Sequence, residues 1–329
     1  MKAAFIEKPG PPENICYGAV PDPKPGDSQV LVRVKAVAVN PIDTYIRSGM
    51  IKAELPTPFI IGCDLAGTVE RVGSNVTRFK MGDRVWGSNQ GLLGRQGTFA
   101  ELAAVDENYL YPTPSGVSDE DAAAVALVGI TAGLGLRRAL LVFGETIFVN
   151  GGSGGVGSTV VQMAKAWGAT VIATAGSDEK VAGCKKLGAD FAINYKTEKV
   201  ADAIKKIAPN GVNVWWETTR EPDFDLIVNA MARRGRIVLM AGRDARPAFP
   251  VGPFYTRDLS LDGLVMFMAS SDEQALAAEG INRWLREGKL KPKIDRVLPL
   301  SEAATAHRLQ EENTIGKKGT LSGKIVLKP

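Results

Sequence analysis

The stretch Thr146-Ile-Phe-Val-Asn-Gly-Gly-Ser-Gly-Gly-Val-Gly-Ser158 decides the fold expected for this 329-residue chain. Ile147, Phe148 and Val149 form a short apolar run that suits a buried strand. The glycines that follow satisfy the pattern G-x-G-x-x-G, and apolar residues at helical spacing come next. A strand, a glycine loop and a helix in this order predict a dinucleotide-binding unit.

Each part of this loop has a physical task. The glycines let the chain turn tightly and let its backbone approach a pyrophosphate, and the helix N-terminus offers unpaired N–H groups and a partial positive charge. The alternative is a glycine loop with a purely structural role. We expect the pyrophosphate to be held by Gly152, Ser153, Gly154, Gly155, Val156 and Gly157.

Composition and charge exclude several classes of protein. The chain is 45% hydrophobic and 23% charged, with a net charge of +4, which argues against nucleic acid or an anionic membrane as its main partner. Its N-terminus has no long apolar stretch, so we expect no signal peptide. No window of the sequence approaches 18 apolar residues, so we expect no membrane span. The three cysteines, Cys16, Cys63 and Cys184, lie far apart, which favours a reducing, cytoplasmic location.

The periodicity changes along the chain and predicts two domains. In the first 120 or so residues, apolar positions alternate over residues 30–36 and prolines punctuate the loops, which is typical of a β-rich, barrel-like or sandwich domain. From about residue 119 strands and helices alternate, which predicts an α/β fold with a doubly wound, parallel sheet. We therefore predict a substrate domain over 1–122 and 270–329, and a dinucleotide-binding domain over 123–269.

The individual elements of the second part follow from the same pattern. We predict helices over 121–127 and 133–142, with a sixth sheet strand at 261–267. Two helices at 272–287 and 301–312 precede a last strand, 323–327, that returns to the first domain. The remaining predicted strands are 146–150, 170–175, 191–194, 214–216 and 236–240, and the remaining helices are 155–167, 178–187 and 222–232.

These motifs together resemble the medium-chain dehydrogenase/reductases of the quinone oxidoreductase (zeta-crystallin-like) branch. The resemblance spans essentially the whole chain. It rests on the glycine loop and on the segments Asn40–Gly49, Gly62–Val69, Gly82–Val85, Gly97–Glu101, Ala304–His307 and Gly323–Leu327.

The resemblance implies a GroES-like substrate domain, a Rossmann domain and an active site in the cleft between them. It also implies NADPH-dependent reduction of quinones or of α,β-unsaturated carbonyl compounds, by a homodimer. Another activated alkene, such as a haloacrylate or an acyl thioester, is an alternative substrate. A non-enzymatic NADPH-binding or RNA-binding role is a second alternative, against which the absence of a basic patch with interleaved aromatic residues argues.

Zinc-dependent relatives in this superfamily hold their metal with cysteine and histidine, and a catalytic site needs three protein ligands. The resemblance aligns their first cysteine with Asn40 and their histidine with Cys63, and the cysteine-rich lobe for structural zinc has no counterpart. His307, the one histidine, falls on a predicted C-terminal helix, where we expect it to be packed or capped. We therefore predict that the protein uses no zinc.

The end of the second strand indicates the choice of cofactor. NAD-preferring sites place an acidic residue there to bind the ribose hydroxyls, but this chain has Ala175-Gly176. The resemblance implies that Ser177, Lys180 and Tyr195 surround the 2′-phosphate of NADPH instead. Asp178 is the counter-evidence, because a small shift would let its carboxylate reach a ribose hydroxyl.

Two residues are candidates for catalysis. The resemblance places Asn40 and Tyr45 beside the substrate. Asn40 is a candidate donor to a carbonyl or to a ribose hydroxyl, and Tyr45 is a candidate acid or polarising group. The alternatives are a loop cap for Asn40 and an ordinary helix aromatic for Tyr45. We expect Asp43 and Arg47 to be structural and paired with each other.

Family positions near the cofactor add a further set of candidates. They are Asn40, Thr131, Thr218, Gly242, Met266, Phe267, Met268 and Lys324. The segment 89–96 is longer than in typical relatives, and either shapes specificity or is a surface loop.

Overall fold

Six parallel strands form the sheet of one of the two compact units into which the chain folds. The computed structural model describes residues 1–329. This unit, unit 2, consists of Thr131–Val265 and Glu287–Lys291. Its strands are β9 (Thr146–Asn150), β10 (Thr170–Ala175), β11 (Phe191–Asn194), β12 (Val212–Glu217), β13 (Met231–Leu239) and β14 (Ser260–Gly263).

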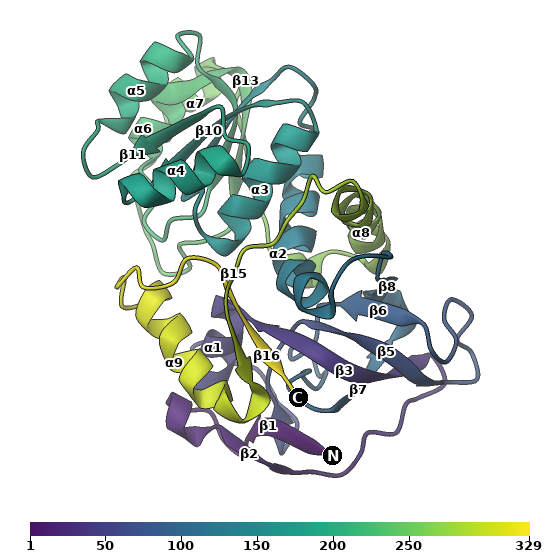
Figure 1. The fold of residues 1–329 in the computed structure, drawn as a ribbon. Helices are drawn as coiled ribbons and strands as arrows, with labels where there is room; N and C mark the ends of the chain where they lie inside the picture. The colour runs from purple at the N-terminus through teal and green to yellow at the C-terminus, as the bar shows by residue number, and fades with distance from the viewer. The chain divides into compact units, whose positions relative to one another are not determined.

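The strand order β11-β10-β9-β12-β13-β14 is that of a Rossmann fold, and it confirms the doubly wound sheet. Ile147, Phe148 and Val149 of β9 are fully buried, as expected for a central strand covered on both faces. Figure 1 shows α3 and α4 in front of this sheet, with α6 and α7 behind it. The helices of unit 2 are α3 (Gly155–Ala166), α4 (Asp178–Lys186), α5 (Val200–Ile207), α6 (Phe224–Ala230) and α7 (Val251–Thr256).

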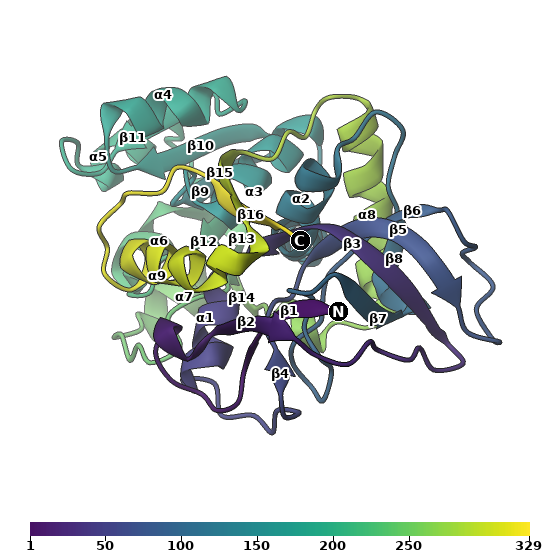
Figure 2. The ribbon, with the colours of Figure 1, turned by 60° about the horizontal axis from the view of Figure 1, so that its bottom comes forward.

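Unit 1 is β-rich and consists of Met1–Ile130, Met266–Arg286 and Pro292–Pro329. Its larger sheet follows the order β15-β16-β3-β5-β6-β8, with β7 paired to β3, and its smaller sheet follows β2-β1-β4. Figure 2 shows β1 beside β2. The strands are β1 (Lys2–Ile6), β2 (Cys16–Ala19), β3 (Gln29–Val39), β4 (Phe59–Ile60), β5 (Leu65–Val72), β6 (Arg84–Gly87), β7 (Leu102–Asp106), β8 (Leu110–Pro112), β15 (Ile294–Pro299) and β16 (Lys324–Lys328).

The strand β3 organises the larger sheet because it pairs with three neighbours. Its first half pairs with β5 and β7, and its last residues, from Val37 to Val39, pair with the C-terminal strand β16. The end of the chain thus returns to the first sheet, as predicted. The helices are α1 (Pro41–Ser48), α8 (Ser271–Arg286) and α9 (Ala303–Thr314), and the 3₁₀ turns are η1 (Pro12–Asn14), η2 (Glu107–Tyr109), η3 (Met266–Met268) and η4 (Leu300–Glu302).

Several predicted elements were wrong. The two helices expected over 121–127 and 133–142 are one helix, α2 (Asp119–Arg138), within which the boundary between the units falls. A Cβ at Gly135 would lie 2.3 Å from the Trp216 ring, so this glycine serves close packing and does not end the helix. The sixth strand ends at Gly263 and is followed by η3, while α5, α7 and β15 were not predicted.

Candidate cofactor site and buried polar clusters

The glycine loop connects β9 to α3 at the carboxyl edge of the parallel sheet. Gly151 has a left-handed φ of +83°, and Gly154 caps α3. A Cβ at Gly157 would lie 2.1 Å from the carbonyl oxygen of Gly151, and a Cβ at Gly152 would lie 2.7 Å from the Ala173 Cβ. The loop therefore packs so tightly that Gly152 and Gly157 have no room for a side chain.

The loop rests on the neighbouring strand β10. The backbone N–H of Gly151 donates to the Thr174 hydroxyl at 2.9 Å, and the N–H of Gly152 donates to the Thr174 carbonyl at 2.9 Å. Thr174 Oγ1 in turn donates to Asn150 Oδ1 at 2.8 Å. These contacts fix the height of the loop above the sheet.

A buried carboxylate completes this arrangement. Glu217, the last residue of β12, is 1% exposed, and both of its oxygens accept from Asn150 Nδ2 at 3.0 Å. Trp215 Nε1 donates to it at 3.0 Å and the Thr219 N–H at 2.7 Å. Asn150, Thr174 and Glu217 were not among the residues predicted from the sequence. Their common signal was a polar residue at or near the carboxyl end of three adjacent, otherwise apolar strands.

The residues predicted to surround a 2′-phosphate meet at the ends of β10 and β11. Ser177 caps α4 by accepting from the Lys180 N–H at 3.3 Å. A Cβ at Gly176 would lie 2.4 Å from the Tyr195 hydroxyl, so the half-exposed Tyr195 lies against this glycine. The Asp178 carboxylate accepts from Asn194 Nδ2 at 2.7 Å, and is thereby held toward β11.

The other predicted cofactor residues lie on several elements. Thr218 follows β12 and donates to the Asn150 carbonyl at 2.5 Å, while Gly242 follows β13 with a φ of +84°. Thr131 is buried in α2. In η3, Met266 and Phe267 are buried and Met268 is exposed.

Unit 1 contains its own buried polar cluster, which brings together residues from distant parts of the chain. Lys324 Nζ donates to Asn40 Oδ1. Asn40 Nδ2 donates to Asp64 Oδ2 at 2.8 Å and to the Ala38 carbonyl at 3.2 Å. The members of this unit 1 polar cluster, all buried, are Asn40, Asp43, Cys63, Asp64, Ser88 and Lys324.

Burial dominates the ionisation of this cluster. It raises the pKa of Asp64 to about 7 and that of Asp43 to about 6, although the nearby Lys324 ammonium opposes both shifts. Burial also lowers the pKa of Lys324, against the attraction of the two carboxylates, and raises that of the Cys63 thiol well above its usual range. Cys63 is therefore a thiol rather than a thiolate at neutral pH.

Of the two predicted catalytic residues, Asn40 is fully buried and its amide is engaged by Lys324, Asp64 and Ala38. The Asn40 N–H donates to Asp43 at 2.7 Å, which makes Asn40 the cap of α1. Tyr45 is half-buried on the same helix. The predicted pairing of Asp43 with Arg47 is wrong, because Arg47 pairs with Glu311 of α9.

No group of three histidine, cysteine, aspartate or glutamate side chains is arranged to hold a metal ion. His307 is packed in α9, fully buried, with its ring edge-to-face with that of Phe99 at 5.9 Å. The absence of zinc remains a prediction.

The segment 89–96 is closed by a contact between its two ends and anchored to the chain before it. Arg95 donates to the Asn89 carbonyl at 2.8 Å, and Gln96 Nε2 donates to the Pro58 carbonyl at 2.8 Å. Leu93, between these anchors, is 52% exposed. Whether the segment shapes specificity stays a prediction.

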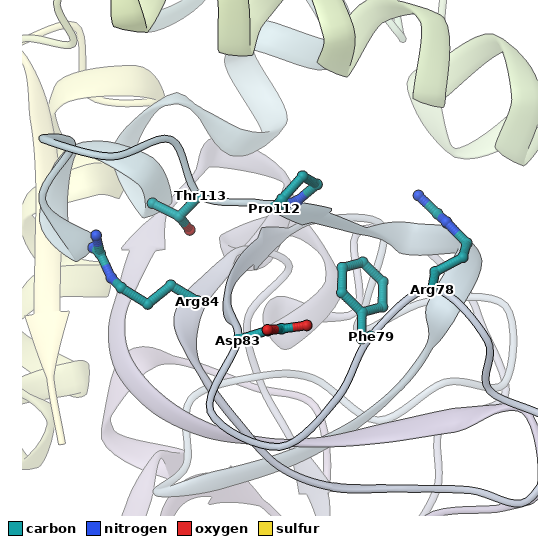
Figure 3. Close-up of a pocket in the computed structure, with 6 residues that line it drawn as sticks. All are labelled: Arg78, Phe79, Asp83, Arg84, Pro112 and Thr113. Carbon is teal, nitrogen blue, oxygen red and sulfur yellow. The ribbon is translucent and has the colours of Figure 1, made fainter.

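A pocket of about 570 Å³ in unit 1 contains none of the predicted site residues (Figure 3). Its two arginines already have partners. Arg78 donates to the Glu107 carbonyl at 2.8 Å, and Arg84 donates to Asp119 at 2.5 Å. With its arginines engaged and no predicted site residue in its lining, the pocket offers no group for the proposed reaction.

In the whole structure no helix combines the length and the apolar character that crossing a membrane requires.

Comparison with known proteins places the chain among dehydrogenases. Residues 26–115 match the alcohol dehydrogenase GroES-like domain, and residues 155–281 match the family described as zinc-binding dehydrogenase. The chain is 33% identical to the quinone oxidoreductase of Sus scrofa, over 99% of this chain and 97% of the relative. It is 34% identical to the 2-methylene-furan-3-one reductase of Solanum lycopersicum, over 94% of this chain and 74% of the relative.

Solved structures agree with this assignment. An NAD-dependent alcohol dehydrogenase superposes with a TM-score of 0.89 at 32% identity, and each chain is covered completely. The Escherichia coli quinone oxidoreductase in complex with NADPH superposes with a TM-score of 0.86 at 27% identity, again over 100% of both chains. The GroES-like and dehydrogenase matches, the strand order of unit 2 and the full-length similarity lead to one conclusion: the chain belongs to the medium-chain dehydrogenase/reductase superfamily, with the quinone oxidoreductases as its relatives.

Proposed function

We propose that this protein is an NADPH-dependent oxidoreductase that reduces quinones or α,β-unsaturated carbonyl compounds without zinc. The observation that carries the proposal is the carboxyl edge of the sheet in unit 2. It combines a sterically closed glycine loop at the N-terminus of α3 with a second strand that ends in Ala175-Gly176-Ser177, without an acid. The quinone oxidoreductase and furanone reductase relatives support the same chemistry.

The residues of unit 2 fit a dinucleotide. The loop from Gly152 to Gly157 would hold the pyrophosphate with its backbone, because a Cβ at either end is excluded by neighbouring atoms. Ser177, Lys180 and Tyr195 would hold the 2′-phosphate, with the lysine supplying a point charge. Thr218 and Gly242, after β12 and β13, would flank the same cofactor.

When bound, the reduced nicotinamide supplies a hydride to the acceptor. The chain's own contribution is to hold the substrate and to stabilise the charge that develops on its carbonyl oxygen. The Tyr45 hydroxyl would donate to that oxygen and supply the proton. Because the Asn40 amide is fully engaged, its role would be to cap α1 and so to place Tyr45, with Lys324 holding the amide in position.

Activity on a panel of acceptors tests the proposal. NADPH oxidation is followed with small quinones, enones, a haloacrylate and an acyl thioester. Turnover of a quinone or an enone supports the proposal, whereas turnover of the haloacrylate or thioester alone would redirect it to another activated alkene. NADPH binding without turnover of any acceptor would favour a non-enzymatic role for the protein.

Substitution of Tyr45 by Phe tests the mechanism. If the hydroxyl donates to the substrate, enone turnover falls toward the range of about 10²–10⁴-fold that acid–base catalysis gives, and less where water supplies the proton. Quinone turnover should fall less, because aromatisation stabilises the reduced product. Unchanged turnover and KM on every active substrate would remove Tyr45 from the site.

Three further features belong to this proposal. Zinc independence predicts no stoichiometric zinc in elemental analysis of the purified protein. A homodimer is expected, and the edge strand β14, with Leu261 38% exposed, offers unpaired backbone groups for it; sedimentation measures its mass. A cytoplasmic location is favoured by the three free cysteines.

A further inference from the structure

A buried carboxylate lies beneath the expected pyrophosphate site, where a negative charge would repel the ligand. Glu217 is 1% exposed, so it does not bind the cofactor directly. It is paired in register with Asn150, the last residue of β9. The donors to its oxygens, Asn150 Nδ2, Trp215 Nε1 and the Thr219 N–H, are all neutral. A site that tolerates this charge next to a pyrophosphate requires an explanation.

The hydrogen bonds around Glu217 form a chain with one direction. A carboxylate only accepts, so the amide nitrogen of Asn150 must face it and the amide oxygen must face Thr174. The Thr174 hydroxyl therefore donates to Asn150, which leaves its lone pair for the Gly151 N–H at 2.9 Å. The charge of Glu217 thus determines that the first glycine of the loop finds an acceptor.

The same carboxylate also holds the other side of the crevice. The Thr219 N–H donates to Glu217 at 2.7 Å, and Thr218 Oγ1 donates to the Asn150 carbonyl at 2.5 Å. The strands β9 and β12 are neighbours at the point where the strand order reverses, which is where Rossmann sheets bind their ligands. One buried group therefore fixes both loops that border the site.

We infer that Glu217 is a positioning residue of the cofactor site, which holds the glycine loop through Asn150 and Thr174. The inference rests on the proposed function and deepens it. The inference predicts that neutralising Glu217 weakens cofactor binding. If its charge only repelled the pyrophosphate, neutralising it would tighten binding; because the charge orients the hydrogen-bond chain, its loss weakens binding instead.

The test is Glu217→Gln, which keeps the shape of the side chain but adds a donor. We expect the Kd of both NADPH and NADH to rise about 10- to 100-fold, the scale of a lost buried hydrogen bond. The KM for NADPH should rise while kcat at saturating NADPH is retained, a split that general destabilisation does not produce. Asp258→Asn, which neutralises a carboxylate that is 78% exposed in the same unit, should leave both Kd values unchanged.

A second pair of variants keeps the inference testable if Glu217→Gln does not fold. Thr174→Val removes the acceptor of the Gly151 N–H without changing shape, and should weaken both cofactors. Thr174→Ser retains the hydroxyl and should restore binding. Unchanged or tighter binding by Glu217→Gln, or equal loss in the two Thr174 variants, overturns the inference. Failure of the unmodified protein to bind NADPH overturns the proposed function instead.

Discussion

Asp64 in unit 1 and Glu217 in unit 2 are both buried carboxylates, but their surroundings differ. Asp64 accepts from Ser88 Oγ at 2.6 Å and from Asn40 at 2.8 Å, and it shares its cluster with a second carboxylate and the Lys324 ammonium. Glu217 is surrounded by neutral donors and connects to the backbone of the glycine loop. The cluster in unit 1 combines two carboxylates with one ammonium, whereas the network in unit 2 leads to the glycine loop, where the pyrophosphate is expected.

The comparison shows how burial changes the use of one functional group. In unit 1, burial raises the pKa of Asp64 to about 7, so the charge of the cluster changes with pH near neutrality and depends on the Lys324 ammonium. In unit 2, the orientation of Asn150 and Thr174 matters more than the balance of charge. Substitutions in the unit 1 polar cluster should therefore affect stability, and those in the hydrogen-bond network of Glu217 should affect cofactor binding.

The largest effect is expected from Gly157→Val, which changes the glycine loop of unit 2 and leaves unit 1 unaltered. Its Cβ would lie 2.1 Å from the Gly151 carbonyl oxygen, so the loop must move and NADPH binding should be lost. The secondary structure of unit 1 should persist in circular dichroism and limited proteolysis. Gly183→Val is the matched control, since a Cβ there meets nothing within 4 Å. Normal NADPH binding by Gly157→Val would disprove the assignment of the loop.

Lys324→Met removes the ammonium of the unit 1 polar cluster. It should reduce the free energy of unfolding by about 3–5 kcal/mol, because it leaves buried carboxylates without their cation. The loss should grow as the pH rises. Asp64 and Asp43 have folded pKa values of about 7 and 6, above the unfolded value of 3.8, and Lys324 lowers both. Without the ammonium the folded pKa values rise further, so the folded variant binds its protons more tightly and loses more stability than the unmodified protein as the pH rises.

The control for this prediction is Lys328→Met. It removes an exposed pair with Glu120, so about 0–1 kcal/mol is expected at any pH. Denaturant unfolding at pH 5 and pH 8 measures both variants. A loss for Lys324→Met as small as that of the control would show that the cluster does not depend on its ammonium.

Lys180→Ala sharpens the contrast between the buried Lys324 and the lysine that is predicted to contact the 2′-phosphate. We expect it to weaken NADPH binding by about 1.5–3 kcal/mol, the scale of a charged hydrogen bond, with NADH nearly unchanged. Titration with both cofactors decides the matter. Equal loss for the two would mean that Lys180 does not contact the 2′-phosphate.

The smallest expected effect concerns His307. Burial lowers the pKa of its imidazole to about 3. The folded protein keeps the ring neutral, while the unfolded chain takes up a proton below its ordinary value of 6.5. Stability from this group is therefore complete above that value, and about 2 kcal/mol is lost at pH 5. His307→Leu should remove this part of the pH dependence. An identical pH profile in the variant would show that His307 does not contribute.

Local signals in the sequence were sufficient for the Rossmann sheet. The glycine loop, β9 and α3 lie within one short stretch, and the apolar run followed by the glycines is enough to predict a strand, a loop and a helix in that order. The two predicted ranges left residues 128–132 of α2 unassigned, although the helix runs through them. Its glycines Gly129 and Gly135 pack closely against Ile281 and Trp216, a tertiary role that helical spacing does not reveal. The edge strand β15 has no continuous apolar run and was not recognised.

The contacts among the buried polar groups could not be predicted from local sequence signals. Lys324 and Asn40 are separated by 284 residues, and Glu217 and Asn150 by 67. Only strand register brings each pair together. The Ser177, Lys180 and Tyr195 group was predicted by resemblance. In the structure Ser177 and Tyr195 follow the adjacent strands β10 and β11, and Lys180 lies in the first turn of α4. Their contact with a cofactor remains a prediction.

The contact between Tyr195 and Gly176 has an evolutionary consequence. A Cβ at position 176 would lie 2.4 Å from the Tyr195 hydroxyl, so any larger residue there displaces the tyrosine. An acidic residue at this position is also the usual means of binding the ribose of NAD. A single mutation to aspartate would thus introduce the feature that favours NAD and dislodge one that favours NADPH. Under the proposed function, one substitution therefore alters two determinants of cofactor preference at once, while Ser177 and Lys180 remain in place.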